Sequence, residues 1–191
     1  MKKKLYSGLI LLLLVSVSIL IMFAPSFFSK GVSRISINKT FDLELILNNT
    51  KNIELVFFGY SGCSDICTPR LFLINDLYAS LNEKAKEQVG IIFLDISTPF
   101  DKELPQRFAA YFNKDFIGIH LNKKILRAYT KTFDVYFSKS LLDQTEYNHT
   151  SNLYLVKKTK GKKEIKYVYN SYPYDIKQIK NDIKELIYEQ Q

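Results

Sequence analysis

Apolar residues are grouped along the chain in patterns that predict both strands and helices. Two compact apolar runs, at 52–58 and 89–97, are rich in β-branched and aromatic residues, which is typical of buried central strands. Between these runs, residues 70–88 repeat apolar side chains at the spacing of a helix. The middle of the chain therefore predicts a strand–helix–strand unit.

The segments on either side extend this unit. We expect short strands over 33–47, then a helix over 101–112, a strand over 116–120, a helix over 122–133, strands over 151–158 and 164–170, and a helix over 176–187. Asn122 is expected to cap the helix that follows it. This order is that of a thioredoxin-like α/β fold, in which helices flank a central mixed sheet.

The N-terminal segment has a different pattern. Three lysines are followed by residues 5–29, which carry no charge, and 8–28 is long enough to span a bilayer. No good cleavage site for a signal peptidase follows, so we expect an uncleaved single-pass anchor in a bacterial inner membrane. Lysines stay on the cytoplasmic side, so the main domain would face the periplasm. The expected organisation is a basic cytoplasmic tail at 1–7, a transmembrane anchor at 8–28, a linker at 29–36 and one domain at 37–191.

Composition agrees with one domain and an appendage. The chain has 191 residues, of which 47% are hydrophobic and 24% charged, as in proteins that bury a core. The net charge of +8 includes the three N-terminal lysines, and the remaining basic residues are scattered along the chain except for one run at 157–166, around Gly161. That run coincides with a predicted hairpin turn, so we interpret it as a solvated turn and expect no binding of nucleic acid.

Both cysteines of the chain, Cys63 and Cys67, directly follow the first buried strand. A helix N-terminus favours thiolate, the form that attacks disulfides and binds metals. A disulfide between them would close a very short loop, so a purely structural role is inefficient. A thiol–disulfide exchanger remains open, although its usual spacing is C-x-x-C. So does a site for Cu(I) or zinc, completed by an imidazole.

The chain has two histidines that could complete such a site. His120 ends a predicted strand and His149 precedes another, and each alone is typical of a surface or capping residue. A structural zinc site would need four protein ligands, and three good ones are available. The residues alone do not choose between the two histidines.

Two segments resemble the SCO/SenC family, thioredoxin-like copper proteins that assist assembly of the CuA centre of cytochrome c oxidase. The stretch FFGYSGCSDIC, at 57–67, resembles the family signature G-Y-T-x-C-P-D-x-C. The stretch NHTSNLYLV, at 148–156, resembles the segment D-H-S/T-x-x-x-Y-L-V, and 93–119 is similar to the stretch between them. Ser64 and Asn148 replace a proline and an acid of that pattern, Pro69 is a displaced proline, and the segment around Asp95 lacks the usual D-P-x-R-D.

The resemblance implies that Cys63, Cys67 and His149 bind one copper ion, as Cu(I) and with Cu(II) as a further state. It implies that the two cysteines are a redox-active pair able to form a disulfide. His120 has no counterpart and is expected to be structural. We expect Asp65 to cap or orient the start of the helix and Tyr60 to pack over the site.

The function implied is a membrane-anchored copper chaperone that delivers copper to cytochrome c oxidase or matures its CuA site. Its partner would be a copper-receiving membrane protein such as an oxidase subunit. The alternative is an enzyme, a thiol–disulfide oxidoreductase that reduces cysteines of that partner, in which His149 would be dispensable. A third interpretation is an anchored module that retains the scaffold for protein contacts alone.

Overall fold

The computed structural model describes residues 12–18, 34–41, 51–159 and 162–189. The chain divides into two units, Met1–Val32 and Ser33–Gln191. The predicted tail at 1–7 lies outside the described residues, as does most of the predicted anchor, of which residues 12–18 form a helix. Within the described part of the chain, no helix is long and apolar enough to cross a membrane.

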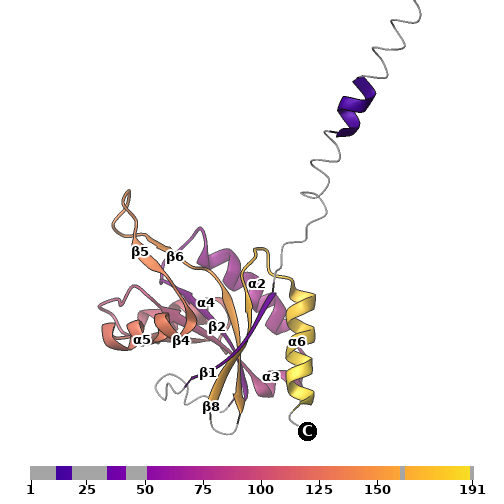
Figure 1. Cartoon of the computed structure of the whole chain (residues 1–191). Helices are drawn as coiled ribbons and strands as arrows, with labels where there is room; N and C mark the ends of the chain where they lie inside the picture. The colour runs from indigo at the N-terminus through magenta and orange to yellow at the C-terminus, as the bar shows by residue number, and fades with distance from the viewer. Residues whose placement is uncertain (1–11, 19–33, 42–50, 160–161, 190–191) are drawn as a thin grey trace, which may run out of the picture. The chain divides into compact units, whose positions relative to one another are not determined.

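Among the described residues of the second unit, eight strands form two sheets (Figure 1). They are β1 (Arg34–Phe41), β2 (Ile53–Gly59), β3 (Val89–Asp95), β4 (Ile117–His120), β5 (Phe137–Lys139), β6 (Tyr147–His149), β7 (Leu153–Thr159) and β8 (Lys162–Tyr169). The larger sheet has the order β1-β8-β7-β2-β3-β4. In it β2, β3 and β4 are parallel, whereas β7 runs antiparallel to β2 and to β8. Every residue of β2 and β3 is buried, as expected for central strands covered on both faces.

The helices of this unit follow the predicted order with one difference. They are α2 (Cys67–Ala79), α3 (Glu83–Gln88), α4 (Leu104–Phe112), α5 (Lys123–Phe133) and α6 (Ile176–Tyr188). The single helix predicted over 70–88 is two helices, because the Asn82 side chain accepts the N–H of Ala85 and starts a new one. Asn122 caps α5 as predicted, by accepting the N–H of Ile125 at 3.0 Å.

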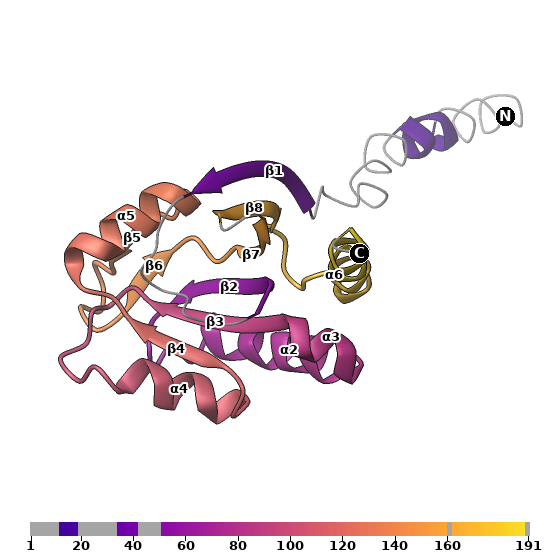
Figure 2. The ribbon, with the colours of Figure 1, turned by 90° about the horizontal axis from the view of Figure 1, so that it is seen from below.

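The helices cover both faces of the large sheet. Successive side chains of a strand point to opposite faces, so the two faces can be followed from the register. Phe58 of β2 faces α5, where the ring of Phe133 lies 5.3 Å away. On the other face, the Tyr169 hydroxyl of β8 donates to Asp182 of α6 at 2.7 Å. Figures 1 and 2 accordingly show α5 and α6 on opposite sides of the molecule.

The smaller sheet was not predicted from the sequence. It consists of β5 and β6 alone, paired antiparallel so that Phe137 lies opposite His149. Strands of three residues are too short to show a period, which is why the pattern of apolar residues did not reveal them. This β5–β6 hairpin matters because it carries His149.

The lysine run between β7 and β8 is not simply a solvated turn. Lys157 is 7% exposed and its Nζ lies 2.7 Å from Glu189 of α6. Lys163 reaches the buried Glu54 of β2, with its Nζ 2.8 Å from the carboxylate. The prediction was wrong for these two residues, because their long side chains extend along the sheet to acidic groups far away in the sequence.

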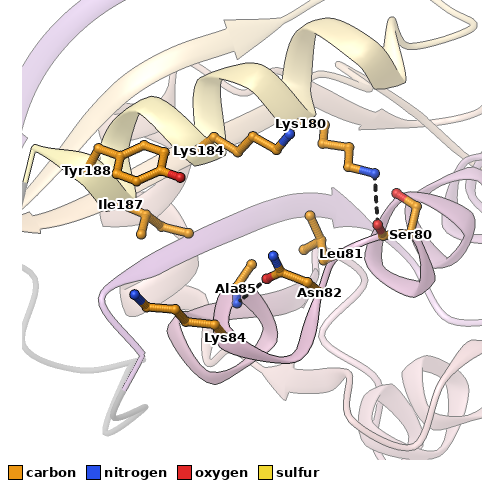
Figure 3. Close-up of a pocket in the computed structure, with 9 residues that line it drawn as sticks. All are labelled: Ser80, Leu81, Asn82, Lys84, Ala85, Lys180, Lys184, Ile187 and Tyr188. Atoms are coloured by element: carbon orange, nitrogen blue, oxygen red, sulfur yellow. Dashed lines mark hydrogen bonds between the residues drawn. The ribbon is translucent and has the colours of Figure 1, made fainter.

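A groove of about 250 Å³ lies between α6 and the turn that joins α2 to α3 (Figure 3). Leu81 and Ile187 contribute apolar walls, and Lys180 of α6 donates to the Ser80 carbonyl at 2.8 Å. The groove lies at the C-terminal end of α2, whereas Cys67 starts that helix. It is therefore not part of the thiol site.

Candidate metal site

The cysteines lie where β2 gives way to α2. Cys67 is the first residue of α2, while Cys63 lies in the preceding turn, so the pair does not share a helix face. Both are free thiols and both are buried. Gly59, the last residue of β2, lets Cys67 approach the sheet: a Cβ at that position would lie 2.7 Å from the Cys67 Sγ.

At the start of α2, a sulfur atom rather than a carboxylate accepts the hydrogen bond from the helix backbone. The N-cap residue is Ile66 and makes no side-chain cap, but the Cys67 N–H donates to the Cys63 Sγ at 3.2 Å. Asp65 is exposed and accepts from Ser64 at 2.7 Å, so the prediction that it caps the helix is wrong. It precedes the N-cap residue by one position, and Ser64 rather than a helix N–H group donates to its carboxylate.

The two thiols differ in acidity. The hydrogen bond from Cys67 lowers the pKa of Cys63 to about 4, and hydrogen bonds from the backbone N–H groups of Cys67 and Ile66 act in the same direction. The pKa of Cys67 is raised, because it gives its proton to that hydrogen bond and because it is buried. The pair thus holds one thiolate, on Cys63, and one thiol that stabilises it.

His149 reaches this pair from β6, although it lies 82 residues after Cys67. Its Nε2 is 3.6 Å from the Cys67 Sγ, and its Nδ1 is 3.0 Å from the Thr150 carbonyl. A carbonyl only accepts hydrogen bonds, so Nδ1 carries the proton and Nε2 presents its lone pair to the sulfurs. The two Sγ atoms and a ring nitrogen of His149 lie within 4.8 Å of one another. This is close enough to hold one metal ion.

The other histidine is not in this group. His120 ends β4, and its Nε2 lies 3.0 Å from the Pro99 carbonyl. Within the described residues, Cys63, Cys67 and His149 are the one such cluster of potential ligands. The structure thus brings together the three side chains singled out in the sequence, and it keeps His120 apart from them. That they bind copper remains a prediction.

A buried carboxylate holds the loops beneath the thiols. Asp95, at the end of β3, is 0% exposed and accepts hydrogen bonds from the backbone N–H groups and hydroxyls of Ser61 and Ser97. Ser61 belongs to the turn that leads to Cys63. Asp95 therefore fixes the start of the cysteine loop against the sheet.

Aromatic rings enclose the site on the hairpin side. Tyr60 is 5% exposed, and its ring meets that of His149 edge to face at 6.0 Å, which agrees with the expected packing. The ring of Tyr147 lies 5.3 Å from Tyr60, and the Tyr60 hydroxyl donates to the carboxylate of Glu146. Sequence reasoning did not find Glu146. Its contact with Tyr60 joins residues 86 positions apart, which no local pattern encodes.

Two soft sulfurs and an imidazole nitrogen form a donor set that favours Cu(I) or zinc, and no carboxylate is within the group. A comparison with known protein families identifies the family to which this chain belongs. The family model described as SCO1/SenC matches residues 49–188, which includes the hairpin and all three side chains. The chain belongs to the SCO1/SenC family.

Individual SCO relatives agree with this assignment. An SCO2-like protein of Rickettsia conorii is 28% identical over 119 residues, which cover 58% of this chain and 58% of that relative. An SCO2-like protein of Rickettsia felis is 27% identical over 110 residues, with 55% and 53% covered. The chain thus spans little more than half the length of the curated relatives it matches.

Solved Sco structures confirm the thioredoxin-like fold. The apo Sco1 protein of Thermus thermophilus has a TM-score of 0.62 at 23% identity, covering 83% of this chain and 95% of that one. The ScoI protein of Arabidopsis thaliana with copper bound has a TM-score of 0.61 at 18% identity, with 72% and 85% covered. At these identities the likeness establishes the mixed α/β arrangement of the domain.

Proposed function

We propose that this chain is a membrane-anchored copper chaperone, which binds one copper ion through Cys63, Cys67 and His149. The acceptor would be a copper-receiving membrane protein such as a subunit of cytochrome c oxidase. The observation that carries the proposal is the meeting of two sulfurs and an imidazole within 4.8 Å in a chain of the SCO1/SenC family. A Sco protein with copper bound among its structural neighbours supports the choice of metal.

The three proposed ligands suit a copper ion that must be released to an acceptor. Two sulfurs and one nitrogen satisfy Cu(I) with three ligands, which leaves a partner's thiolate room to enter and displace them one at a time. The thiolate on Cys63 is available at neutral pH because its pKa is lowered to about 4 by the Cys67 hydrogen bond. The Nδ1 hydrogen bond to Thr150 holds the imidazole in the tautomer that can ligate.

The proposal includes the periplasmic face of a bacterial inner membrane. Its support is the basic N-terminal tail followed by the uncharged segment 5–29. An anchor would confine the domain to the membrane surface and raise its effective concentration near a membrane-bound acceptor.

A Cu(I) titration of the reduced full chain, in competition with a chelator, tests this function. We expect one ion per chain, loss of binding in Cys63→Ala and Cys67→Ala, and weaker binding in His149→Ala. The matched control is His120→Ala, which removes the other imidazole and should bind as the unmodified chain does. A His149→Ala protein with unchanged affinity would contradict the proposed ligand set.

A thiol–disulfide oxidoreductase is the second candidate, favoured by the thiolate on Cys63 beside a free thiol. In this reaction the Cys63 sulfur attacks a partner's disulfide, and one partner sulfur leaves as thiolate and takes a proton. Cys67 then gives up its proton and attacks the mixed disulfide, which releases the second partner thiol. Two electrons pass to the partner and a Cys63–Cys67 disulfide remains. Reduction that persists in His149→Ala would support this activity.

A further inference from the structure

The β5–β6 hairpin is a separate piece of sheet, and His149 depends on it for its position. The hairpin pairs with itself and not with the six-stranded sheet. At its base, the Thr150 N–H donates to the Tyr136 carbonyl at 2.9 Å. A space of about 300 Å³ separates Phe137 and Tyr147 of the hairpin from Leu126 of α5 and the loop after β3. Packing on that side of the hairpin is therefore incomplete, although Tyr147 packs against the core.

Tyr60 is the side chain that connects the hairpin to the cysteine loop. It follows β2 directly, and its carbonyl accepts the N–H of Cys63 at 3.2 Å. Its ring contacts those of Tyr147 and His149, which lie on one face of β6 because they are two residues apart. Its hydroxyl donates to the carboxylate of Glu146, the residue just before that strand.

We propose that Glu146 is a positioning residue for the metal site: by accepting the Tyr60 hydrogen bond it holds the hairpin closed and keeps the His149 ring over the two sulfurs. The inference rests on the proposed function, in which His149 is a ligand. A buried phenol needs a partner for its hydroxyl, and Glu146 supplies one from the element that must be held. The contacts of the Tyr60 ring with Tyr147 and His149 hold the hairpin against the cysteine loop, and the hydrogen bond to Glu146 fixes its position along that contact.

The loop of the hairpin is held by hydrogen bonds within the hairpin itself. The Ser140 N–H donates to the Glu146 carbonyl at 2.9 Å, and Asp143 accepts from the N–H and hydroxyl of Thr145 at 2.8 and 2.6 Å. Loss of the Tyr60 hydrogen bond should therefore release the hairpin as an intact unit. The His149 ring would move with it.

Cu(I) affinity of the reduced full chain, measured by chelator competition, tests the role of Glu146. Groups that orient a metal ligand typically change metal affinity 10–100-fold when removed, so Glu146→Ala and Tyr60→Phe should each weaken binding by about tenfold or more. Glu146→Gln keeps an acceptor oxygen and should retain most of the affinity. Asp143→Ala is the matched control, an acid of the same hairpin bonded within it, and should bind normally.

Two further measurements separate positioning from a general loss of structure. In a His149→Ala background, Glu146→Ala should weaken Cu(I) binding no further, since its effect passes through the imidazole. In the metal-free protein, the NMR signals of the His149 ring should shift or broaden in Glu146→Ala and stay in place in Asp143→Ala. The NMR measurement tests the positioning of His149 even if the chain does not bind copper.

Three results would overturn the inference. They are normal Cu(I) affinity in both Glu146→Ala and Tyr60→Phe, an undiminished effect of Glu146→Ala without His149, and a Glu146→Gln variant as weak as Glu146→Ala. Failure of the proposed function would look different, because His149→Ala itself would then bind as the unmodified chain does.

Discussion

Replacing Gly59 by alanine should disturb the fold and the metal site together. Gly59 ends β2 directly beneath the cysteines, and an added Cβ would lie 2.7 Å from the Cys67 Sγ and 2.9 Å from the Phe93 ring. Ordinary contacts between such atoms begin near 3.5 Å, so the sulfur must recede by about 0.8 Å. Cys67 is 0% exposed, so its sulfur would have to move within a buried, packed environment.

The expected cost follows from the crowding. Forcing an extra methyl group into a close-packed core typically costs about 1–3 kcal/mol. For a domain of this size that corresponds to a fall in Tm of roughly 2–12 °C. The displaced sulfur also leaves its place 3.6 Å from the His149 Nε2, so we expect Cu(I) affinity to fall about tenfold, which is equivalent to about 1.4 kcal/mol. Thermal unfolding and chelator competition measure the two effects.

A Cys67→Ala background tests whether the sulfur is responsible. There the contact at 2.7 Å is gone and only the crowding of aromatic rings remains. The Gly59→Ala cost should then fall by roughly 1 kcal/mol, as expected for residues in contact. Equal costs in both backgrounds, or a Gly59→Ala protein with normal Tm and Cu(I) affinity, would refute the reasoning.

Three other predictions concern groups that hold the fold around the site. Lys163→Met leaves the Glu54 carboxylate, which is 2% exposed, without its cation, and should lower the free energy of unfolding measured in urea by about 3–5 kcal/mol. Adding Glu54→Leu should restore most of the lost stability. A Lys163→Met variant as stable as the unmodified chain would contradict this prediction. Burial raises the pKa of Tyr154 from 10.0 to about 12, so its contribution to stability is present below pH 10 and is lost as pH rises to 12. Tyr154→Phe should therefore reduce the alkaline decline in unfolding free energy by about 2 kcal/mol, and an unchanged pH profile would count against it. Asp95→Asn turns a donor toward Ser61 or Ser97 and should cost about 1–3 kcal/mol, with faster amide hydrogen exchange at both serines, while the exposed Asp143→Asn should change little.

The sequence alone determined the elements that depend on neighbours along the chain. Strands β2 and β3 were visible as apolar runs, α5 as a periodic segment with a cap, and the cysteine pair as a motif at a strand–helix junction. Each of these signals arises within about fifteen residues, where side-chain spacing and backbone hydrogen bonding decide the conformation. The family resemblance added the prediction that His149 belongs with the two cysteines.

The tertiary structure decided everything that depends on how distant segments meet. It showed that β5 and β6 pair as a hairpin and that this hairpin carries His149 to the two cysteines. It also revealed the partners of Asp95 and Glu146, and the buried ion pair of Glu54 with a lysine 109 residues away. Such contacts are set by strand register and by the packing of layers, which no local period encodes. That is why the three candidate ligands could be named from the sequence, while the roles of Asp95 and Glu146 could not.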